Sequence, residues 1–309
     1  MKNRINLDED LRSKLYPYPL HKLEITTAEK IGKMNFLDSQ NPSDTALLCV
    51  HGNPTWSFYY RSLMDHFSQD LRVVIPDHLG MGLSSRFKNE TFTLSDRVDH
   101  LVELLEHLNL KKIYLVVHDW GGPIGMLALK KWRSKKPAER IWLGVTFLNT
   151  AVMKARHLSK RISLCRNLLQ PLVKHFGIFN YGLPIWGAHQ RLSSLVKRGL
   201  LLPYKTSENR KSVADFIRDI PLSTEDKSYE LIDALERFLP EVDVPVQILW
   251  GEKDFCFDTK YLTLMKQFFP NAEVFSWKDA GHLILEDIPL QVCAKLETFL
   301  SKHKIRIVP

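Results

Sequence analysis

Short runs of apolar and β-branched residues recur along the chain and alternate with longer segments that contain charged and turn-forming residues. The runs occupy positions 47–50, 73–75, 113–117, 145–148, 246–249 and 274–277. Apolar runs this short, bounded by turn residues, are typical of strands buried on both faces of a parallel sheet. We therefore expect these segments to form the core of a largely parallel sheet.

A helical periodicity lies between the second and third of these runs. The stretch "LSDRVDHLVELLEHLNL" at positions 94–110 repeats apolar residues at helical spacing, at Val98, Leu101, Val102, Leu105 and Leu108. The hydroxyl of Ser95 suits the N-cap position of such a helix. One apolar stripe predicts an amphipathic helix that packs its apolar face on the sheet.

The alternation of strands and helices predicts an α/β fold with a mostly parallel central sheet and helices on both faces. In such folds, ligands bind beyond the carboxyl ends of the strands. The alternation breaks at residues 151–239, which are basic, rich in Leu, Phe and Trp, and interrupted by Pro and Gly. We expect residues 1–150 and 240–309 to form the core, and residues 151–239 to form a helical lid (cap) inserted after the sixth core strand.

Charge is unevenly distributed along the chain. The formal net charge is +8, and residues 151–220 contain thirteen Lys and Arg against three acidic residues. Such a face could meet an acidic partner protein, an anionic membrane surface or nucleic acid, although basic residues also serve as solvated surface. The sequence contains no aromatic-interleaved RNA-binding motif and no zinc-finger spacing, so we expect no nucleic-acid partner.

Several further classes of protein are disfavoured by composition. The first residues are charged, and no stretch approaches the roughly 20 apolar residues of a membrane helix, so we expect no transmembrane segment and a cytoplasmic location. The four cysteines are far apart and form no CxxC pair, which indicates reduced thiols rather than disulfides or zinc ligands. No flavin or nucleotide motif is present, so we expect no cofactor and no metal.

The stretch "VVHDWGG" at positions 116–122 places Asp119 between a strand and the glycines that open a helix. This is the arrangement of the nucleophile elbow, G-x-S-x-G, in which a sharp turn exposes the nucleophile at the edge of the sheet. Two positions differ, because Val117 replaces the first small residue and Asp replaces Ser. Taken alone, Asp119 fits a helix N-cap as well as a nucleophile.

Two later positions favour the nucleophile. Asp254 follows the strand in "LWGEKD", and His282 follows the next strand in "AGHL". Nucleophile, acid and histidine in this chain order, each at a strand end, predict a catalytic triad in which Asp254 orients His282. Asp258 and Glu286 are fallback candidates for the acid.

A fourth element is the turn "HGNP" at positions 51–54, directly after a core strand. A turn there supplies a backbone amide that faces the nucleophile and forms an oxyanion hole with the amide of Trp120. The side chains of Asn53 and Trp120 carry N–H donors, so together they could hold an anion. Asn-Pro is also a common turn pair, and Trp120 could be a core residue.

Five stretches together resemble the haloalkane dehalogenase branch of the α/β-hydrolase superfamily: "HGNPTWSFYYR", "PDHLGMGLS", "HDWGG", "WGEKD" and "GHLILED". The likeness runs over most of residues 16–300 and implies the α/β-hydrolase fold. The chain also resembles a sister group, the β-lactone decarboxylases of long-chain olefin biosynthesis. The stretch "FIRDIPLSTEDKSYELI" and the "WSFYYR" segment are more similar to this group.

The resemblance implies a role for each candidate residue. Asp119 is the nucleophile, His282 and Asp254 are the base and its acid, and Asn53 and Trp120 bind the leaving group. One dehalogenase group instead carries its acid as Glu after the sixth strand. This chain has Asn149 in "FLNTAV" there, so Asp254 must serve.

An ionised carboxylate can displace a leaving group from saturated carbon, which suits several substrates. We expect decarboxylation of a long-chain cis-β-lactone to an olefin, with hydrolytic dehalogenation of a haloalkane as the alternative. Epoxide hydrolysis is a third choice, because that chemistry uses two lid tyrosines and the lid contains Tyr181, Tyr204 and Tyr229. Serine esterases are disfavoured because position 119 is not Ser, and the complete residue set disfavours a non-catalytic scaffold.

We expect a small apolar substrate, bound in a slot between the lid and the sheet. Candidate lining residues are the large apolar residues of the lid, namely Phe176, Phe179, Trp186, Leu200, Leu201 and Phe216. An apolar slot excludes water and strengthens binding of a developing anion. The basic lid surface is a candidate docking face for acidic partner proteins of the same pathway.

Overall fold

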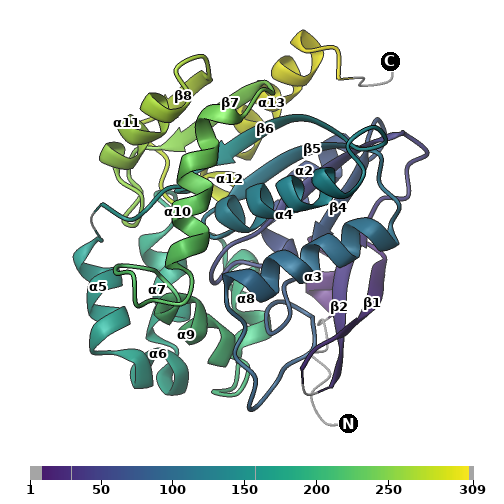
Figure 1. The fold of residues 1–309 in the computed structure, drawn as a ribbon. Helices are drawn as coiled ribbons and strands as arrows, with labels where there is room; N and C mark the ends of the chain where they lie inside the picture. Colours follow the sequence, from purple (N-terminus) through teal and green to yellow (C-terminus); the bar gives the residue numbers. More distant parts are fainter. Residues whose placement is uncertain (1–8, 29, 157, 306–309) are drawn as a thin grey trace.

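A computed structural model describes residues 9–28, 30–156 and 158–305. Eight strands form a single sheet in the order β1-β2-β4-β3-β5-β6-β7-β8. The strands are β1 (Leu20–Thr26), β2 (Ile31–Asp38), β3 (Thr45–Val50), β4 (Arg72–Pro76), β5 (Lys112–His118), β6 (Ile141–Leu148), β7 (Val246–Gly251) and β8 (Glu273–Trp277). The pairs from β4 to β8 are parallel, and only β1–β2 and β2–β4 are antiparallel among the described strands. The expected α/β fold with a mostly parallel sheet is confirmed (Figure 1).

All six expected strands are present, as β3 to β8. The apolar runs in the sequence did not predict β1 and β2, which form an antiparallel hairpin at one edge of the sheet. The side chains of β1 alternate between exposed and half-buried, and only Ile25 is buried. Because one face of this hairpin meets solvent, its sequence lacks the continuous apolar run that marks the central strands.

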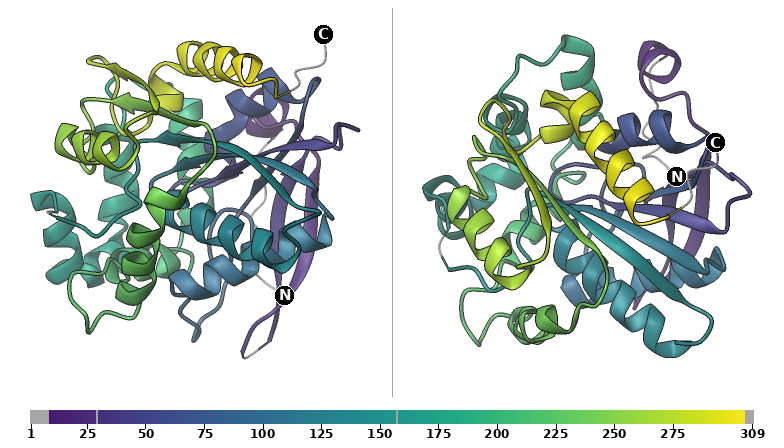
Figure 2. Two further views of the ribbon diagram at one scale, coloured as in Figure 1. Left: turned by 45° about the horizontal axis from the view of Figure 1, so that its top comes forward. Right: turned by 90° about the horizontal axis from the view of Figure 1, so that it is seen from above.

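Helices lie on both faces of the sheet (Figure 2). The core helices are α1 (Glu9–Lys14), α2 (Arg61–Phe67), α3 (Leu94–His107), α4 (Gly121–Lys135), α11 (Thr259–Phe268), α12 (Ile284–Asp287) and α13 (Pro289–Lys302), with the 3-10 turn η1 (Ser57–Tyr60). Helices α3 and α4 cover one face, and α2 and α13 cover the other. None of the described helices is long and apolar enough to cross a membrane.

Helix α3 begins slightly earlier than expected. Its N-cap is Thr93 and not Ser95. The carboxylate of Asp96 accepts hydrogen bonds from the backbone N–H and the hydroxyl of Thr93, both at 2.7 Å. The carboxylate of Asp96 thereby satisfies the backbone N–H of Thr93 at the start of the helix. Ser95 already lies inside the first turn and could not accept from this N–H.

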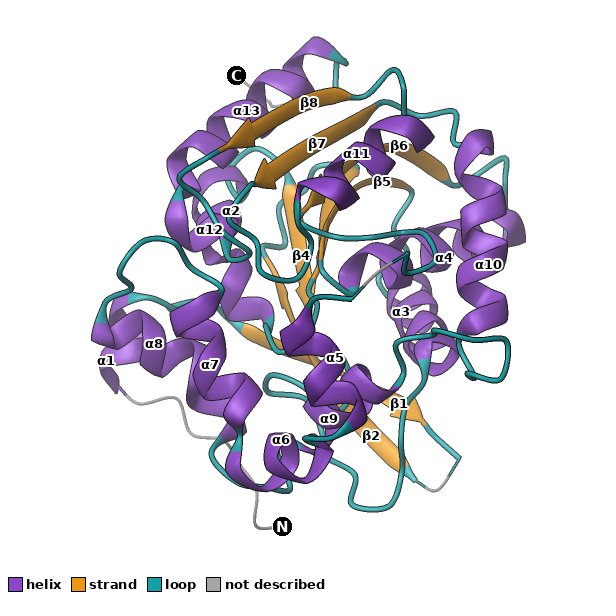
Figure 3. Ribbon diagram, turned by 90° about the vertical axis from the view of Figure 1, so that its left-hand side faces the viewer, coloured by secondary structure: helices purple, strands orange, loops and turns teal. Residues whose placement is uncertain are grey.

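Between β6 and β7 the chain forms a run of short helices: α5 (Lys160–Asn167), α6 (Gln170–Phe176), α7 (Ile178–Trp186), α8 (Ser194–Leu201), α9 (Lys211–Arg218) and α10 (Tyr229–Phe238), with the 3-10 turns η2 (Leu202–Tyr204) and η3 (Leu239–Glu241). Figure 1 shows α5, α6, α7 and α9 grouped at the lower left, away from most of the sheet, and this side of the molecule faces the viewer in Figure 3. Helix α10 runs back beside α4 in Figure 1. We use "lid" for residues 151–239, and the division into lid and core stays a prediction.

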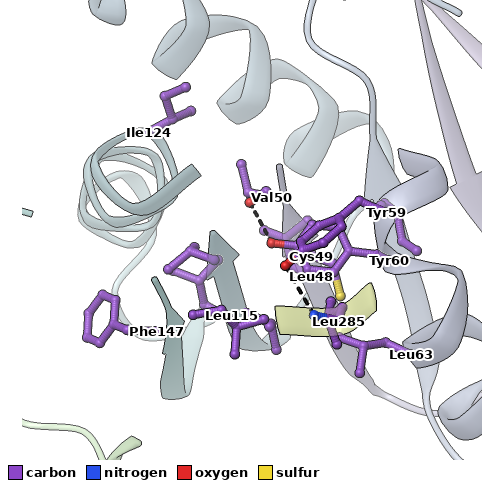
Figure 4. Close-up of a cluster of buried hydrophobic side chains, with 14 of the residues drawn as sticks. Leu48, Cys49, Val50, Tyr59, Tyr60, Leu63, Leu115, Ile124, Phe147 and Leu285 are labelled. Atoms are coloured by element: carbon purple, nitrogen blue, oxygen red, sulfur yellow. Dashed lines mark hydrogen bonds between the residues drawn. The ribbon is translucent and has the colours of Figure 1, made fainter. Parts of the chain in front are cut away.

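The core around β3 and β5 is filled by side chains with no exposed surface, including Leu48, Val50 and Leu115 (Figure 4). Fully burying one large apolar side chain contributes about 1.5–3 kcal/mol. The two tyrosines of η1 bring hydroxyls into this cluster: Tyr60 donates to the Val50 carbonyl at 2.9 Å, and Tyr59 accepts from a backbone amide of α12 at 3.3 Å. These bonds anchor the loop after β3 to the sheet and to α12.

Candidate active site

Asp119 lies at the turn between β5 and α4, in the left-handed backbone conformation with φ of 52°. The turn requires glycine beside it, since a Cβ at Gly121 would lie 1.9 Å from the carbonyl oxygen of Val50. A Cβ at Gly52 would lie 2.2 Å from Oδ1 of Asp119. Close approach of these backbones holds the Asp119 carboxylate against the loop after β3, in a strained elbow of the expected kind.

The two oxygens of Asp119 have different surroundings. Oδ1 accepts a hydrogen bond of 2.7 Å from the backbone N–H of Asn53, and the backbone N–H of Trp120 also bonds to the carboxylate. Oδ2 lies 3.9 Å from Nε2 of His282. Burial raises the pKa of Asp119 to about 6, although His282 and the two amides oppose the shift. Oδ1 of Asp119 is therefore held by a backbone amide, whereas Oδ2 is available to a substrate.

His282 follows β8, and Asp254 follows β7. Nδ1 of His282 lies 2.8 Å from Oδ2 of Asp254. Because a carboxylate only accepts, Nδ1 carries the proton, which directs Nε2 towards Asp119. Burial disfavours the charged ring, but the carboxylates of Asp254 and Asp119 outweigh it and raise the pKa of His282. The structure thus brings together the three residues that the motif order predicts.

Asp254 is fixed by three donors. Its Oδ1 accepts from the backbone amides of Cys256 at 2.6 Å and Phe257 at 3.0 Å, and its Oδ2 accepts from Nδ2 of Asn149 at 2.9 Å. The side chain of Asn149 also donates to the carbonyl oxygen of Gly251 at 3.0 Å and accepts from the backbone N–H of Gly251 at 2.9 Å. The sequence indicated only that residue 149 is not an acid, and it did not predict that Asn149 positions Asp254. The only available signal was its place after β6.

The two fallback acids have other partners. Oδ1 of Asp258 accepts from the backbone N–H of Lys260 at 2.9 Å and caps α11. Both carboxylate oxygens of Glu286 pair with the guanidinium of Arg61, each at 2.6 Å. A bidentate pair of this kind leaves Glu286 little capacity for a second partner. Asp254 is therefore the carboxylate that contacts His282.

A cavity of about 810 Å³, counting the part open to solvent, adjoins the carboxylate of Asp119. Asn53, Trp120 and His282 lie in its wall beside Asp119, and the remaining wall is largely apolar. Nδ2 of Asn53 donates to the carbonyl oxygen of Val213 in α9 at 3.2 Å, which leaves its second N–H for a ligand. The candidate leaving-group residues thus face the same space as the candidate nucleophile.

Comparison with known proteins places the chain in a family. A profile described as the alpha/beta hydrolase fold matches residues 45–289. The chain belongs to the α/β-hydrolase fold family. It is 36% identical over 266 residues to a cis-3-alkyl-4-alkyloxetan-2-one decarboxylase of Shewanella oneidensis, covering 83% of this chain and 82% of the relative.

Other α/β hydrolases are similar at greater distance. A decarboxylase of the same name from Xanthomonas campestris is 34% identical over 88% of this chain and 93% of its own. Haloalkane dehalogenase 2 of Mycobacterium tuberculosis is 29% identical over 86% of this chain and 90% of its own. The solved structure of haloalkane dehalogenase DbeA from Bradyrhizobium elkani has a TM-score of 0.79 at 18% identity, covering 93% and 99% of the two chains, which shows a shared fold. These relatives are enzymes, as expected.

Within this α/β-hydrolase fold, the lid lines the cavity with other residues than those expected. Of the six predicted lining residues, only Phe179 lies in its wall. Phe176 is 68% exposed and Trp186 is 37% exposed, so they were wrongly predicted. The lid contributes instead Leu158, Ile162, Ile217, Ile220 and Ile232. Sequence alone could not separate the inner from the outer faces of such short helices, because each spans only about two turns.

Phe216 lies outside the cavity wall and packs on Trp120, which is part of the wall. Its ring packs on Trp120, with centroids 5.6 Å apart, and the guanidinium of Arg97 lies 3.5 Å above it. Arg97 is buried in α3 and bonds to the carbonyl oxygen of Phe92 at 3.2 Å. Sequence analysis missed this stack, which fixes the plane of the Trp120 indole.

The lid tyrosines are not placed for epoxide chemistry. Tyr181, Tyr204 and Tyr229 are all described, and none lies in the cavity wall. Tyr181 is 49% exposed, and the buried hydroxyl of Tyr204 contacts the loops after β3 and β4. No donor pair equivalent to that of epoxide hydrolases is therefore formed by these three residues.

The cysteines are free thiols, as expected. Cys49, Cys165 and Cys293 are buried, and Cys256 is partly buried in the wall of the cavity. Within the described ranges, no group of His, Cys, Asp and Glu is arranged to hold a metal ion.

Proposed function

We propose that this α/β hydrolase decarboxylates a cis-β-lactone with alkyl substituents to an olefin, with Asp119 as covalent nucleophile. The observation that carries the proposal is the asymmetric Asp119 carboxylate, with Oδ1 held by the amide of Asn53 at 2.7 Å and Oδ2 facing His282 beside an apolar cavity. The identity of 34–36% to decarboxylases named for 3,4-dialkyl oxetanones supports this substrate class.

All atoms and electrons in the proposed reaction come from the substrate and Asp119. Oδ2 attacks the ring carbon that carries the lactone oxygen, and the carbon–oxygen bond breaks to give an Asp119 ester and a carboxylate. The bond from the neighbouring carbon to this carboxylate then breaks. Its electron pair forms the double bond as CO2 leaves, and the ester carbon–oxygen bond breaks to restore Asp119. No acceptor water and no cofactor enter the step.

Each remaining site residue has a role in this scheme. The N–H groups of Asn53 and Trp120 bind the carboxylate as it leaves the ring carbon, where a preorganised donor has its largest effect. The imidazolium of His282, paired with Asp254, keeps Asp119 ionised. The apolar wall accommodates the alkyl substituents and excludes water, which would otherwise hydrolyse the ester.

A second candidate is hydrolytic dehalogenation of a haloalkane. It is favoured by the 29% identity to haloalkane dehalogenase 2 and by the His282–Asp254 pair, which can activate water. In this reaction, the carboxylate displaces halide, and His282 takes a proton from water that attacks the ester carbonyl. The amides of Asn53 and Trp120 then stabilise the oxyanion.

A paired turnover assay distinguishes the two reactions. The purified protein is incubated with a cis-β-lactone bearing two long alkyl chains, followed by alkene and CO2, and separately with a 1-haloalkane, followed by halide. We expect alkene formation that Asp119→Ala lowers by about 10³-fold or more. Asp243→Ala, at an exposed site away from the cavity, is the matched control. Halide release without alkene would support the dehalogenase, and neither product would reject both.

Two expectations accompany this function. We propose a cytoplasmic location, and residues 151–239 acting as a lid over a core of 1–150 and 240–309. Docking of acidic partner proteins on the basic lid stays a prediction. The exposed apolar side chains beside the basic ones favour a partner that also accepts apolar groups.

A further inference from the structure

The outer face of the lid carries apolar side chains. Of the twelve large hydrophobic side chains that are exposed among the described residues, seven fall within positions 164–186; six lie on α5, α6 and α7, and Leu168 lies between α5 and α6. Leu168, Phe176 and Ile185 are 72%, 68% and 70% exposed. Single exposed apolar residues are ordinary, whereas a concentration of this kind marks an interaction surface. We call Leu164, Leu168, Leu172, Phe176, Tyr181 and Ile185 the apolar lid face.

The chain segment that contains this face has basic residues but no acidic ones. Residues 151–207 contain ten Lys and Arg and no Asp or Glu. Some of these cations pair with carboxylates elsewhere, as Arg166 does with Asp226 at 2.9 Å. Lys160 and Lys174, which flank the apolar lid face on α5 and α6, have no ion-pair partner in the part of the chain that the structure describes. The surface therefore combines protruding apolar groups with uncompensated positive charge.

We propose that the apolar lid face docks the protein on the surface of an anionic lipid bilayer. Amphipathic surfaces bind bilayers through apolar side chains that enter the acyl boundary and basic side chains that meet anionic headgroups. A second copy of the chain is a poorer occupant, because it would bring the same positive charge against itself. The complementary partner is an acidic surface that also accepts apolar groups.

Two of the helices that carry the apolar lid face also line the cavity, so docking would bring the cavity close to the bilayer. Ile162 of α5 and Phe179 of α7 line the cavity, while Leu164 and Tyr181 of the same helices are exposed on the outside. Figure 1 shows both helices, with α6, at the lower left, which is the end of the molecule remote from most of the sheet. If the proposed function holds, its long-chain substrate partitions into bilayers, and a docked lid shortens the path to Asp119. The docking itself does not depend on that chemistry.

Vesicle sedimentation tests the proposal without any substrate. The full-length protein is mixed with vesicles of phosphatidylcholine alone, or of phosphatidylcholine with phosphatidylglycerol in about a two-to-one ratio. We expect binding to the anionic vesicles and much weaker binding to the neutral ones. Asp119→Ala is expected to bind equally, so failure of the proposed function and failure of docking are distinguishable.

Matched surface variants locate the docking face. Phe176→Ser and Ile185→Ser are each expected to weaken binding roughly tenfold, whereas Leu290→Ser, at a side chain 79% exposed on α13, is expected to leave it unchanged. Lys160→Glu and Lys174→Glu are expected to weaken binding roughly fivefold or more each, with exposed Lys278→Glu as the control. Unchanged thermal unfolding confirms that each variant is folded.

Three results would overturn the proposal. The first is no binding to anionic vesicles, and the second is binding that the lid variants leave intact. The third is a dimer in sedimentation velocity that Phe176→Ser dissociates, which would make the apolar lid face an interface between copies. Binding of an acidic protein through this face, with no vesicle binding, would replace the bilayer by that partner.

Discussion

Asp119 combines two properties that are hard to obtain together in water: it is buried, with 6% of its surface exposed, and it is placed to act as an anion. Burial alone favours the protonated acid, which is a poor nucleophile. The amides of Asn53 and Trp120 and the cationic form of His282 favour the carboxylate. The balance between these influences makes the reactivity of Asp119 sensitive to pH.

The first prediction is a loss of activity in acid. Burial raises the pKa of Asp119 to about 6. An acid is deprotonated above its pKa, so the nucleophilic carboxylate is lost as pH falls through about 6. We expect kcat/KM to decrease roughly tenfold for each unit below that point, measured with the substrate that the enzyme turns over. Circular dichroism at each pH confirms folding, and a flat profile between about pH 5 and 7 would contradict the assignment.

Asn149 gives a second prediction at this scale. It donates to Asp254 at 2.9 Å and adopts a φ of 34°, which asparagine tolerates better than alanine. Asn149→Ala is expected to lose about 2–4 kcal/mol of stability, because buried partners on Gly251 and Asp254 are left unpaired. Urea denaturation measures the loss.

Asn149→Asp separates positioning from stability. It preserves the acceptor for the amide of Gly251 but places a second carboxylate beside Asp254. A carboxylate cannot donate the hydrogen bond that Asn149 gives to Oδ2 of Asp254, and like charges repel, so Asp254 would be held less well against His282. We expect kcat to fall and the pH profile to shift. A normal kcat and profile would show that Asn149 is merely structural.

These residues differ in how far sequence could reveal them. Asp119, Asp254 and His282 each follow an apolar strand, so the shared edge of a parallel sheet brings them together. Asn149 has no motif, and its function exists only through contact with residues about 100 positions away. The Arg97–Phe216 stack likewise joins helices from the core and the lid, which no local pattern predicts.

At the scale of elements, the turn between β5 and α4 decides the geometry of the site. The helix starts so close to β3 that a Cβ on Gly121 would meet the Val50 carbonyl. Backbone atoms cannot move aside as a flexible side chain can. Gly121 in "HDWGG" is thus explained by the close packing of α4 against β3.

We predict that Gly121→Ala destabilises the fold by about 3 kcal/mol or more, because the added methyl group overlaps the backbone. Gly125→Ala on the same helix is the matched control. Its Cβ would meet only side-chain atoms of Val117 and Leu115, the nearest at 2.9 Å, and alanine favours the helix. Thermal unfolding compares the two variants. Equal stabilities would show that the close approach of α4 to Val50 does not exclude a side chain at position 121.

Prediction of elements succeeded where burial was complete and failed at boundaries. The six central strands have continuous apolar runs, whereas β1 has a single buried residue. The start of α3 depended on Asp96 reaching back to Thr93, a contact that competes with the equally plausible cap at Ser95. In the lid, the faces of short helices are set by neighbours distant in sequence, so Phe176 was assigned to the wrong side.

For the whole molecule, the lid and the loop of His282 form one unit. The carboxylate of Asp287 accepts from the backbone amides of His189 and Gln190 in the lid, at 2.9 and 2.7 Å, and from that of Gly281 at 2.7 Å. On the other side of His282, the amide of Leu283 donates to the lid carbonyl of Gly187 at 2.7 Å. Residues 187–190 of the lid therefore support the position of the histidine, while other residues of the lid line the cavity.

Loss of the Asp287 hydrogen bonds should destabilise both the lid and the loop that carries His282. We predict that Asp287→Ala lowers the melting temperature by roughly 2–8 °C, for a loss of about 1–3 kcal/mol, and lowers kcat more than it changes KM. Asp243→Ala, at an exposed acid that contacts neither the lid nor the loop of His282 in its ion pair with Arg133, is the matched control. The comparison uses thermal unfolding and steady-state kinetics. Reduced stability with unchanged kcat would show that the lid does not support His282.

The central claim is that Asp119 forms a covalent ester, and trapping that ester tests it most directly. His282→Ala removes the group that would activate water, and at about pH 9 the Asp119 carboxylate is ionised without the histidine cation. An ester formed when Asp119 displaces halide from a 1-haloalkane should therefore accumulate at that pH. The account predicts that intact-protein mass increases by one alkyl group, located by peptide mapping on Asp119 and absent from the His282→Ala variant that also carries Asp119→Asn. An unmodified mass, or an alkyl group found only on Cys256 in the cavity wall, would contradict it.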